Sequence, residues 1–216
     1  MIGSAIDVEI YAPNALSLDP GIETIVEVAL RSRGDAAQIQ YGLVSDSLEF
    51  VNHRWATTPV HAGLGPGQRI SNRLTLEAPK RPECKAGVYP IWIEVNTRNG
   101  NGEPGSCRHP IEVTVNKFVE WRAKLIPNKA ERPGAYIFQL TNLSNHTVQF
   151  AITGEEIFGE EILEDPTRSC IFDIEPGQPI LYPGQLGQID VLVKVPERRP
   201  LNPIRFKLNV EPQEPL

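Results

Sequence analysis

The sequence has no long apolar run and no excess of basic residues. No stretch approaches the roughly 20 consecutive apolar residues that a membrane-spanning helix needs. The first segment, "MIGSAIDVEIYAP", has no basic start and is interrupted by Asp7 and Glu9, which is unlike a signal peptide. We therefore expect a cytoplasmic protein with neither a signal peptide nor a transmembrane segment.

The charge is weakly acidic and evenly spread. The net charge of −6 comes from ten Lys/Arg against thirteen Asp/Glu in residues 1–116, and from eleven against fourteen in residues 117–216. Neither half offers the basic surface that neutralises phosphates, so we expect no nucleic-acid partner.

Cysteine is scarce, and its spacing suggests neither a disulfide nor a zinc site. A hairpin turning at "NGNG" (residues 99–102) would place Cys84 and Cys107 roughly 33 Å apart at about 3.3 Å per residue, beyond disulfide reach. With Cys170 the count is odd, and no Cys-x-x-Cys or Cys/His spacing is present. We expect three free thiols in a reducing compartment, and no metal or cofactor.

Catalytic motifs are also missing. No G-x-S-x-G nucleophile motif occurs, and the four histidines have no i,i+2 or i,i+4 spacing. The stretch "GLGPGQ" (residues 63–68) precedes a strand rather than a helix, and Pro66 removes one amide, so it predicts a turn and not a phosphate-binding loop. The sequence therefore favours a protein that is not an enzyme.

Alternation of apolar and polar residues with a period of two is present throughout. Twenty Pro and seventeen Gly suit many short strands joined by turns. Roughly seven short strands per 100 residues, each buried on one face, are typical of an immunoglobulin-like sandwich. The apolar members of the clearest strands are Val26, Val28 and Leu30; Ile91, Ile93 and Val95; Tyr136, Phe138 and Leu140; and Ile189, Val191 and Val193.

A short turn motif occurs twice and divides the chain. "PGQ" followed by a strand and a later Pro occurs at Pro66 and again at Pro183, 183 − 66 = 117 residues further on. We interpret it as the Pro-Gly turn into the fifth strand of two copies of one fold. The prediction is all-β: two tandem immunoglobulin-like β-sandwiches, residues 1–116 and 117–216, joined by the very short linker "NKF" (residues 116–118) and forming a stiff rod.

The most unusual stretch is "GEEIFGEEILEDP" (residues 154–166), where six acids surround two apolar pairs. We expect it in the loop between the third and fourth strands of the second domain. It is a solvated loop or an acidic docking element for a basic partner; calcium is disfavoured because the D-x-D-x-D-G spacing is absent. The candidate partner-binding residues are Glu155, Glu156, Ile157, Phe158, Glu160 and Glu161.

Two tryptophans are further candidates for partner binding. In "VYPIWIEV" (residues 88–95), parity places Trp92 opposite the core set, where it is an interface anchor or is covered by a neighbouring loop. Trp55 lies in a long irregular segment and either caps the sandwich or meets a partner. Trp121 is expected in the core by parity. The sequons at Asn142 and Asn145 are interpreted as turn chemistry.

The stretches "LSLDPGIETIVEVALRSRGD", "LGPGQRISNRLTLEAPKRPECKAGVYPIWIEV" and "LYPGQLGQIDVLVKVPERRP" resemble tandem immunoglobulin-like repeats of bacterial proteins. These repeats are of the cell-adhesion-related (CARDB-like) or NPCBM-associated type, sometimes labelled "hydrolytic protein". The "aGxYp" element of such repeats corresponds here to residues 86–90 and is lacking in the second half. Some relatives are encoded beside phage-tail-like contractile injection systems.

The resemblance implies a structural or adaptor role and brings no catalytic residues. The leading hypothesis is therefore a non-enzymatic protein that contacts other protein subunits of a larger bacterial assembly. The alternative is a carbohydrate-binding or adhesion module with Trp92 or Trp55 as a stacking platform. A hydrolase is suggested only by the label on relatives.

Overall fold

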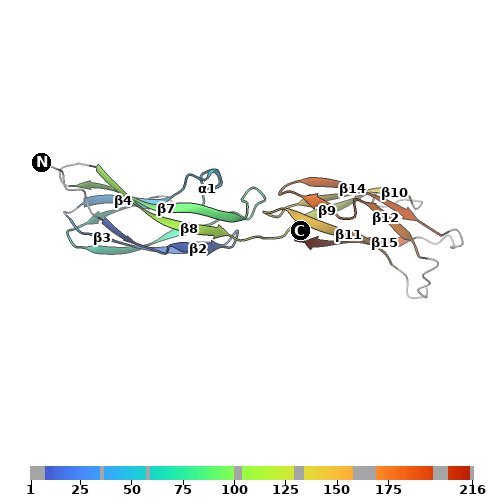
Figure 1. The fold of residues 1–216 in the computed structure, drawn as a ribbon, viewed down its shortest axis with the longest axis horizontal. Coiled ribbons are helices and arrows are strands. Elements are labelled where there is room, and N and C mark those ends of the chain that lie inside the picture. The colour runs from blue at the N-terminus through green and yellow to red at the C-terminus, as the bar shows by residue number, and fades with distance from the viewer. Residues whose placement is uncertain are drawn as a thin grey trace. The chain divides into compact units, whose positions relative to one another are not determined.

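The structure is a computed structural model that describes residues 8–34, 37–56, 59–99, 104–128, 134–157, 169–196 and 204–214. The chain divides into two compact units, Met1–Lys117 (unit 1) and Phe118–Leu216 (unit 2). The division falls one residue after the boundary expected from the sequence. Each unit has its own apolar core, and each is nearly all β (Figure 1).

Unit 1 consists of two sheets and one short helix. Its smaller sheet is antiparallel, with the order β1 (Val8–Tyr11), β3 (Thr24–Ser32), β6 (Arg69–Leu76). Its larger sheet has the order β2 (Ala15–Leu18), β8 (Pro104–Val115), β7 (Gly87–Asn99), β4 (Ala37–Val44), β5 (Val60–Leu64). Only the β2–β8 pair among these described strands is parallel. The helix is α1 (Leu48–His53).

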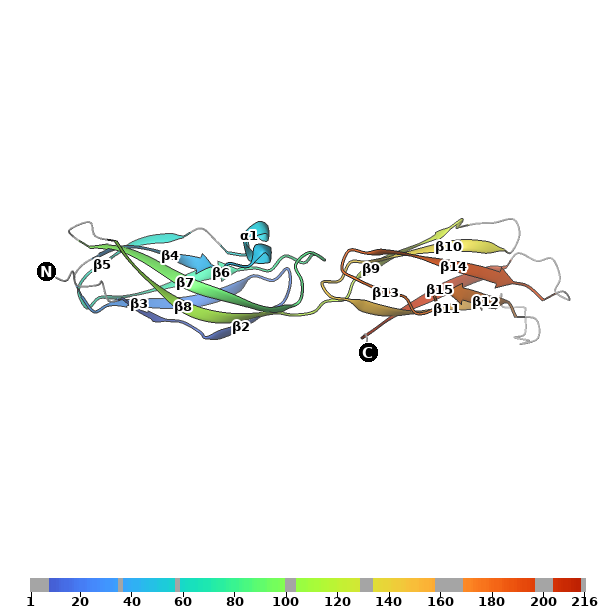
Figure 2. The same ribbon diagram turned by 45° about the horizontal axis from the view of Figure 1, so that its top comes forward.

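Unit 2 also consists of two sheets. One has the order β12 (Ile171–Glu175), β14 (Leu186–Lys194), β10 (Ala135–Asn142), β9 (Trp121–Ile126). The other has the order β13 (Ile180–Leu181), β11 (Val148–Ile157), β15 (Arg205–Gln213). All described pairs in unit 2 are antiparallel. Figure 2 shows the same strands from a second direction.

The alternation read from the sequence corresponds to the faces of the sheets. Each of the clearest apolar sets is buried, while the residues between its members are polar or at least partly exposed, apart from Ala29, which is also buried. Because successive side chains of a strand point to opposite faces, each sheet presents one apolar face to the other. The β-sandwich arrangement predicted from the pattern is confirmed at this level.

The repeated "PGQ" is a turn in both units. Gly67 has φ +67° and Gly184 has φ +75°, the left-handed region that glycine tolerates. The side-chain oxygen of Gln68 accepts from the backbone N–H of Gly65 at 2.8 Å, and Gln185 accepts from Tyr182 at 2.9 Å. The glutamine therefore stabilises the turn, which explains why all three residues recur. The strands that follow, β6 and β14, are the sixth described strand of each unit and not the fifth.

The first and last residues of the linker each form a hydrogen bond. The side-chain amide of Asn116 donates to Asp19 of unit 1 at 2.7 Å, and the backbone N–H of Phe118 donates to the Asn145 side chain of unit 2 at 3.0 Å. Hydrogen bonds within each unit thus fix the first and last of the three linker residues.

The structure contains elements that the alternation does not indicate. These are α1 and the strands β2, β5, β12 and β13, most of them five residues or shorter. The prediction that Trp121 lies in the core is wrong. Trp121 pairs with Asn142, which is buried, so it lies on the inward side of β9 as expected. Trp121 is nevertheless 38% exposed.

Candidate functional site

The outer face of the larger sheet of unit 1 carries an aromatic side chain. Trp92 of β7 lies between Val44 of β4 and Pro110 of β8 in one cross-strand row. Its neighbours in the chain, Ile91 and Ile93, are fully buried on the opposite face, so the outward position predicted from parity is confirmed. The three outward side chains form an apolar cross-strand row on this face.

An arginine covers part of the Trp92 ring. The guanidinium carbon of Arg108 lies 5.9 Å from the ring centroid, within the range of a cation–π contact. The same guanidinium pairs with Glu94 at 2.6 Å. Hydrogen bonds from Asn96 and Arg108 lower the pKa of the Glu94 carboxyl. Trp92 is thus partly buried, and the Arg108 guanidinium of its own sheet lies over the ring.

Trp55 is not available to a partner. It is 1% exposed and packs against Phe50 of α1 at 5.9 Å and against Tyr89 at 5.0 Å between ring centroids. The helix α1, capped by the Ser47 side chain, brings Phe50 over the end of the core. The alternative that Trp55 caps the sandwich holds, and its assignment as a partner-binding residue or sugar platform is wrong.

The first four residues of the acidic stretch are strand and not loop. β11 continues to Ile157, opposite Arg205 of β15. Glu155 points outward and is paired with Lys207 at 3.0 Å and with the Asn209 side chain at 3.0 Å. The hydrogen bond from Asn209 lowers the pKa of the Glu155 carboxyl most, and the one from Lys207 lowers it further.

Glu156 points into unit 2. It is 8% exposed, and its Oε2 accepts from the backbone N–H of Cys170 at 2.9 Å. A buried carboxylate that holds a neighbouring backbone cannot dock a basic partner, so this assignment is corrected. Ile157 ends the strand and is 49% exposed, in accord with a surface role. Phe158, Glu160 and Glu161 lie outside the described residues.

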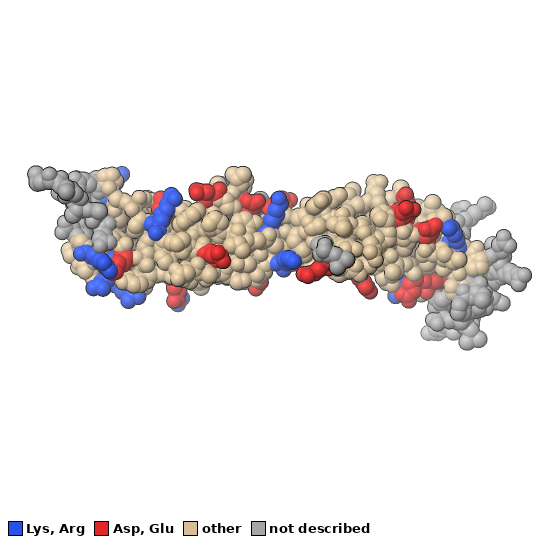
Figure 3. Space-filling view, in the orientation of Figure 1, with Lys and Arg blue, Asp and Glu red and all other residues tan. Residues whose placement is uncertain are grey.

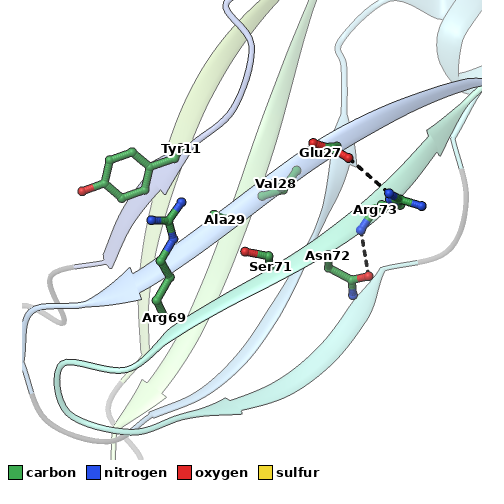
Figure 4. A pocket seen from close by; sticks show the side chains of 8 residues that line it. All are labelled: Tyr11, Glu27, Val28, Ala29, Arg69, Ser71, Asn72 and Arg73. Carbon is green, nitrogen blue, oxygen red and sulfur yellow. Dashed lines mark hydrogen bonds and ion pairs between the residues drawn. The ribbon is translucent and has the colours of Figure 1, made fainter.

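A surface depression of about 590 Å³ lies on the outer side of the smaller sheet of unit 1 (Figure 4). Arg69 stacks over the Tyr11 ring at 5.4 Å, and Arg73 pairs with Glu27 at 3.4 Å. Arg69 and Arg73 therefore already have partners on the surface. The depression could not be predicted from the sequence, because the alternation along β6 indicates only a strand. Figure 3 shows acidic and basic side chains interspersed on the visible face.

Several chemical features concern the described residues as a whole. None of Cys84, Cys107 and Cys170 is in a disulfide. Asn142 and Asn145 are 0% and 1% exposed, and both accept backbone hydrogen bonds, as turn chemistry requires. Within the described ranges no group of three potential metal ligands occurs. None of the helices in this part of the chain reaches the length and apolarity of a membrane-spanning segment.

No family model matches the sequence, and no curated protein sequence matches it. Among solved structures, the chain is similar to the CsuC–CsuE chaperone–tip adhesion subunit pre-assembly complex from archaic chaperone-usher Csu pili of Acinetobacter baumannii. That likeness has 10% identity, covers 96% of this chain and 100% of that chain, and has a TM-score of 0.43.

Two further likenesses are of the same order. The E. coli chaperone DraB shares 11% identity over 89% of this chain and 86% of its own, with a TM-score of 0.36. A protein of unknown function from Porphyromonas gingivalis W83 shares 10% identity over 87% and 83%, with a TM-score of 0.35. At these values the likenesses carry no argument about function.

Proposed function

We propose that this is a non-enzymatic structural or adaptor protein that binds other protein subunits of a larger bacterial assembly. The observation that carries the proposal is the outward row of Val44, Trp92 and Pro110 on unit 1. Tryptophan and arginine are the side chains most enriched among residues that dominate protein–protein binding energies. Here the two lie in contact on one flat sheet face.

The surroundings of Trp92 favour a protein partner over a sugar. Arg108 lies over the ring, and Glu94 holds that guanidinium in place, so the platform is partly occupied. Val88, on the same outward side of β7, is 58% exposed and extends the apolar surface along the strand. An elongated apolar surface with one ion pair suits a protein interface. With Trp55 buried, the carbohydrate alternative rests on Trp92 alone.

We also propose that both units are immunoglobulin-like sandwiches, as the family resemblance implies. The pairing order supports this: β1–β3–β6 in unit 1 corresponds to β9–β10–β14 in unit 2, and β5–β4–β7 corresponds to β13–β11–β15. A place beside a phage-tail-like contractile injection system is the form of assembly that the resemblance suggests. Three free thiols suit the reducing cytoplasm, where we place the protein.

The experiment is affinity capture from the native host with three baits: the wild-type chain, the Trp92→Ala variant and a Leu48→Ala control. Leu48 is 72% exposed in the same unit and is not part of the Trp92 row, so its loss tests exposed apolar area in general. We expect Trp92→Ala to weaken capture of a defined partner by about tenfold or more, with Leu48→Ala neutral.

Purified partner and variant would then be titrated directly, and thermal unfolding would verify that both variants are folded. Equal affinity of all three baits would remove the Trp92 row from the interface. Binding on a glycan array that is lost with Trp92→Ala would replace the proposal by the carbohydrate alternative.

A further inference from the structure

Unit 2 has an edge strand at a position where the corresponding strand of unit 1 has a neighbour on both sides. Six strands correspond in chain order and in pairing, from β1 with β9 to β7 with β15. In unit 1, β7 is paired on one side with β4 and on the other with β8 over twelve residue pairs. In unit 2, β15 pairs with β11, and the described residues contain no strand on its other side. β15 is therefore an edge at the position where β7 is central.

The side chains of β15 are less buried than those of β7. Ile91, Ile93 and Val95 on the inward side of β7 are each 0% exposed. The corresponding inward residues of β15, Phe206, Leu208 and Val210, pack against the core of unit 2 but are only partly buried. A strand beside β15 would cover them as β8 covers β7.

The facing sheet shows the same deficit. Trp121, Ala123 and Leu125 lie on the inward side of β9, because they pair with the inward-facing residues of β10. Nevertheless Trp121 is 38% exposed, Ala123 is exposed and Leu125 is only partly buried. Val8, on the corresponding strand β1, is 8% exposed and lies against Cys107 of β8, whose thiol is 3.8 Å from the Val8 carbonyl oxygen.

We refer to the inward side chains of β9 and β15 together as the open edge: Trp121, Ala123, Leu125, Phe206, Leu208 and Val210. Exposed edges are common in sandwiches. Trp121 and Ala123 differ from an ordinary edge, because the inward apolar residues of the edge strands β1 and β5 of unit 1, such as Ile10 and Val60, are at least partly buried.

We propose that the open edge binds an extended segment of another protein, which adds to the sheet as an antiparallel strand beside β15. Such strand addition combines main-chain hydrogen bonds with pockets for alternate side chains. The occupant has an apolar side chain at every second position, as β8 has with Ile111, Val113 and Val115. This apolar alternation is inferred from β8, the strand of this chain that fills the corresponding position of unit 1.

The outer side of β15 adds a charge preference. Arg205 and Lys207 point outward there, and both are exposed, although Lys207 already pairs with Glu155 of β11 at 3.0 Å. In unit 1 the outward cross-strand pair Glu94 and Arg108 forms an ion pair of 2.6 Å between β7 and β8. An acidic residue at an outward position of the incoming strand would make the corresponding contact. Pro212, which lacks an N–H, limits pairing to the first part of β15.

The inference extends the proposed function to a second surface and does not depend on Trp92. The test uses the full chain and a synthetic peptide with the sequence of residues 110–116, "PIEVTVN", which has the β8 alternation and an outward Glu112. The matched control peptide has Ile111→Asp and Val113→Asp. A second variant carries the same seven residues after residue 216, joined by a short Gly-Ser-Asn linker, so that they can return beside β15.

Amide hydrogen exchange over β15 is the readout. We expect the peptide to slow exchange at Phe206–Val210 by about tenfold or more, since paired edge amides become protected. The extended variant should show the same slow exchange without any added peptide. Adding the peptide to it should have no further effect, because the place beside β15 is already occupied. The control peptide should do nothing, and Trp92→Ala should leave all of these results unchanged.

Unchanged exchange at β15 with both the peptide and the extension overturns the proposal, as does an equal effect of the control peptide. A concentration-dependent dimer of the unextended chain, absent from the extended variant, identifies the occupant as a second copy and overturns the assignment to another protein. Each of these failures leaves the Trp92 proposal standing. If wild type and Trp92→Ala capture the partner equally well while β15 is protected as expected, the Trp92 proposal is removed and the open-edge proposal stands.

Discussion

Gly154 offers the sharpest test of how the chain passes from β11 into the acidic stretch. A Cβ at this position would lie 2.2, 2.3 and 2.7 Å from the Cγ, Cδ1 and Cβ atoms of Phe172. Packed carbon atoms prefer about 3.5–4.0 Å, so the shortfall exceeds 1 Å at the ring. Phe172 itself packs against Phe206, with ring centroids 5.6 Å apart. We predict that Gly154→Ala destabilises unit 2.

The magnitude follows from the two ways in which the clash can be relieved. Keeping the ring in place forces shifts of the backbone and of side chains, which typically cost about 1–3 kcal/mol in a packed core. Moving the ring out loses the burial of Phe172, which is half-buried and is therefore worth about 1–2 kcal/mol, below the full value for a buried phenylalanine. The free energy of unfolding of unit 2 should thus fall by about 1–3 kcal/mol.

The assay is urea unfolding followed by the NMR cross-peaks of unit 2, arranged as a double-mutant cycle with Phe172→Ala. Phe172→Ala removes the ring and its contacts at 2.2 and 2.3 Å but keeps the Cβ at 2.7 Å. The cost of Gly154→Ala should therefore fall in the Phe172→Ala background, and it should drop below about 0.5 kcal/mol with Phe172→Gly, which also removes that Cβ. The control is Gly63→Ala in β5. No atom lies within 4 Å of a Cβ built there, and the substitution should be neutral or stabilise unit 1 by up to about 1 kcal/mol.

If Gly154→Ala is as neutral as Gly63→Ala, β11 does not run past Phe172. Residues 154–157 would then belong to a solvated loop, as expected from their composition, and the burial of Glu156 would be wrong as well. An unfavourable effect that persists unchanged without the Phe172 ring would refute the steric reasoning while leaving the strand in place.

Three further predictions concern the core, the open edge and the buried acid. Burial, with a contribution from Glu49, raises the pKa of the Cys84 thiol from 9.0 to about 11. The stability that this thiol contributes is complete below about pH 9 and is lost as the pH rises towards 11, and alkylation at pH 8 should be about a hundredfold slower than in urea. Trp55→Ala should cost about 3–5 kcal/mol of unfolding free energy, and Trp121→Ala only about 1–2 kcal/mol, because its site is open to water; equal costs would show that the open edge is covered. Glu156→Ala should cost about 1–3 kcal/mol, since the backbone N–H of Cys170 loses its acceptor, and a neutral result by thermal or urea unfolding would contradict the burial of this carboxylate.

Strand alternation could be predicted because it depends only on which side of a sheet each residue faces. Val26, Val28 and Leu30 illustrate this: all three are buried, at 0–2% exposure. The short strands were missed for the same reason, since four or five residues give too few alternations to distinguish from chance. β2 has a further difficulty, because it pairs in parallel with β8, 97 residues away along the chain (112 − 15 = 97).

The candidate site shows where parity fails. Parity placed Trp92 and Trp121 on the correct sides of their strands, but it gives no information about what lies opposite. Trp121 faces inward and its ring packs edge-on against Phe150 of the facing sheet at 6.1 Å between centroids, yet it is still 38% exposed, because it lies on an edge strand. Composition misled in the same way at Glu156, where an acid in an acidic stretch occupies an inward position and binds a backbone N–H.

The two units differ most where their common pattern stops. The "PGQ" turn recurs with the same glutamine hydrogen bond in both, and it is followed by a strand with the same neighbour in each sheet, β3 for β6 and β10 for β14. Such shared features serve the fold, because a turn that fails would disturb the register of the sandwich. The strand β8 and the row that includes Trp92 occur in unit 1. In the described part of unit 2, the inward residues of β15 are only partly buried, and Trp121 and Ala123 of β9 are exposed. Unit 2 keeps the turns, and among its described residues no strand pairs with the second side of β15. This is why we propose that recognition of another chain lies in the difference between the units.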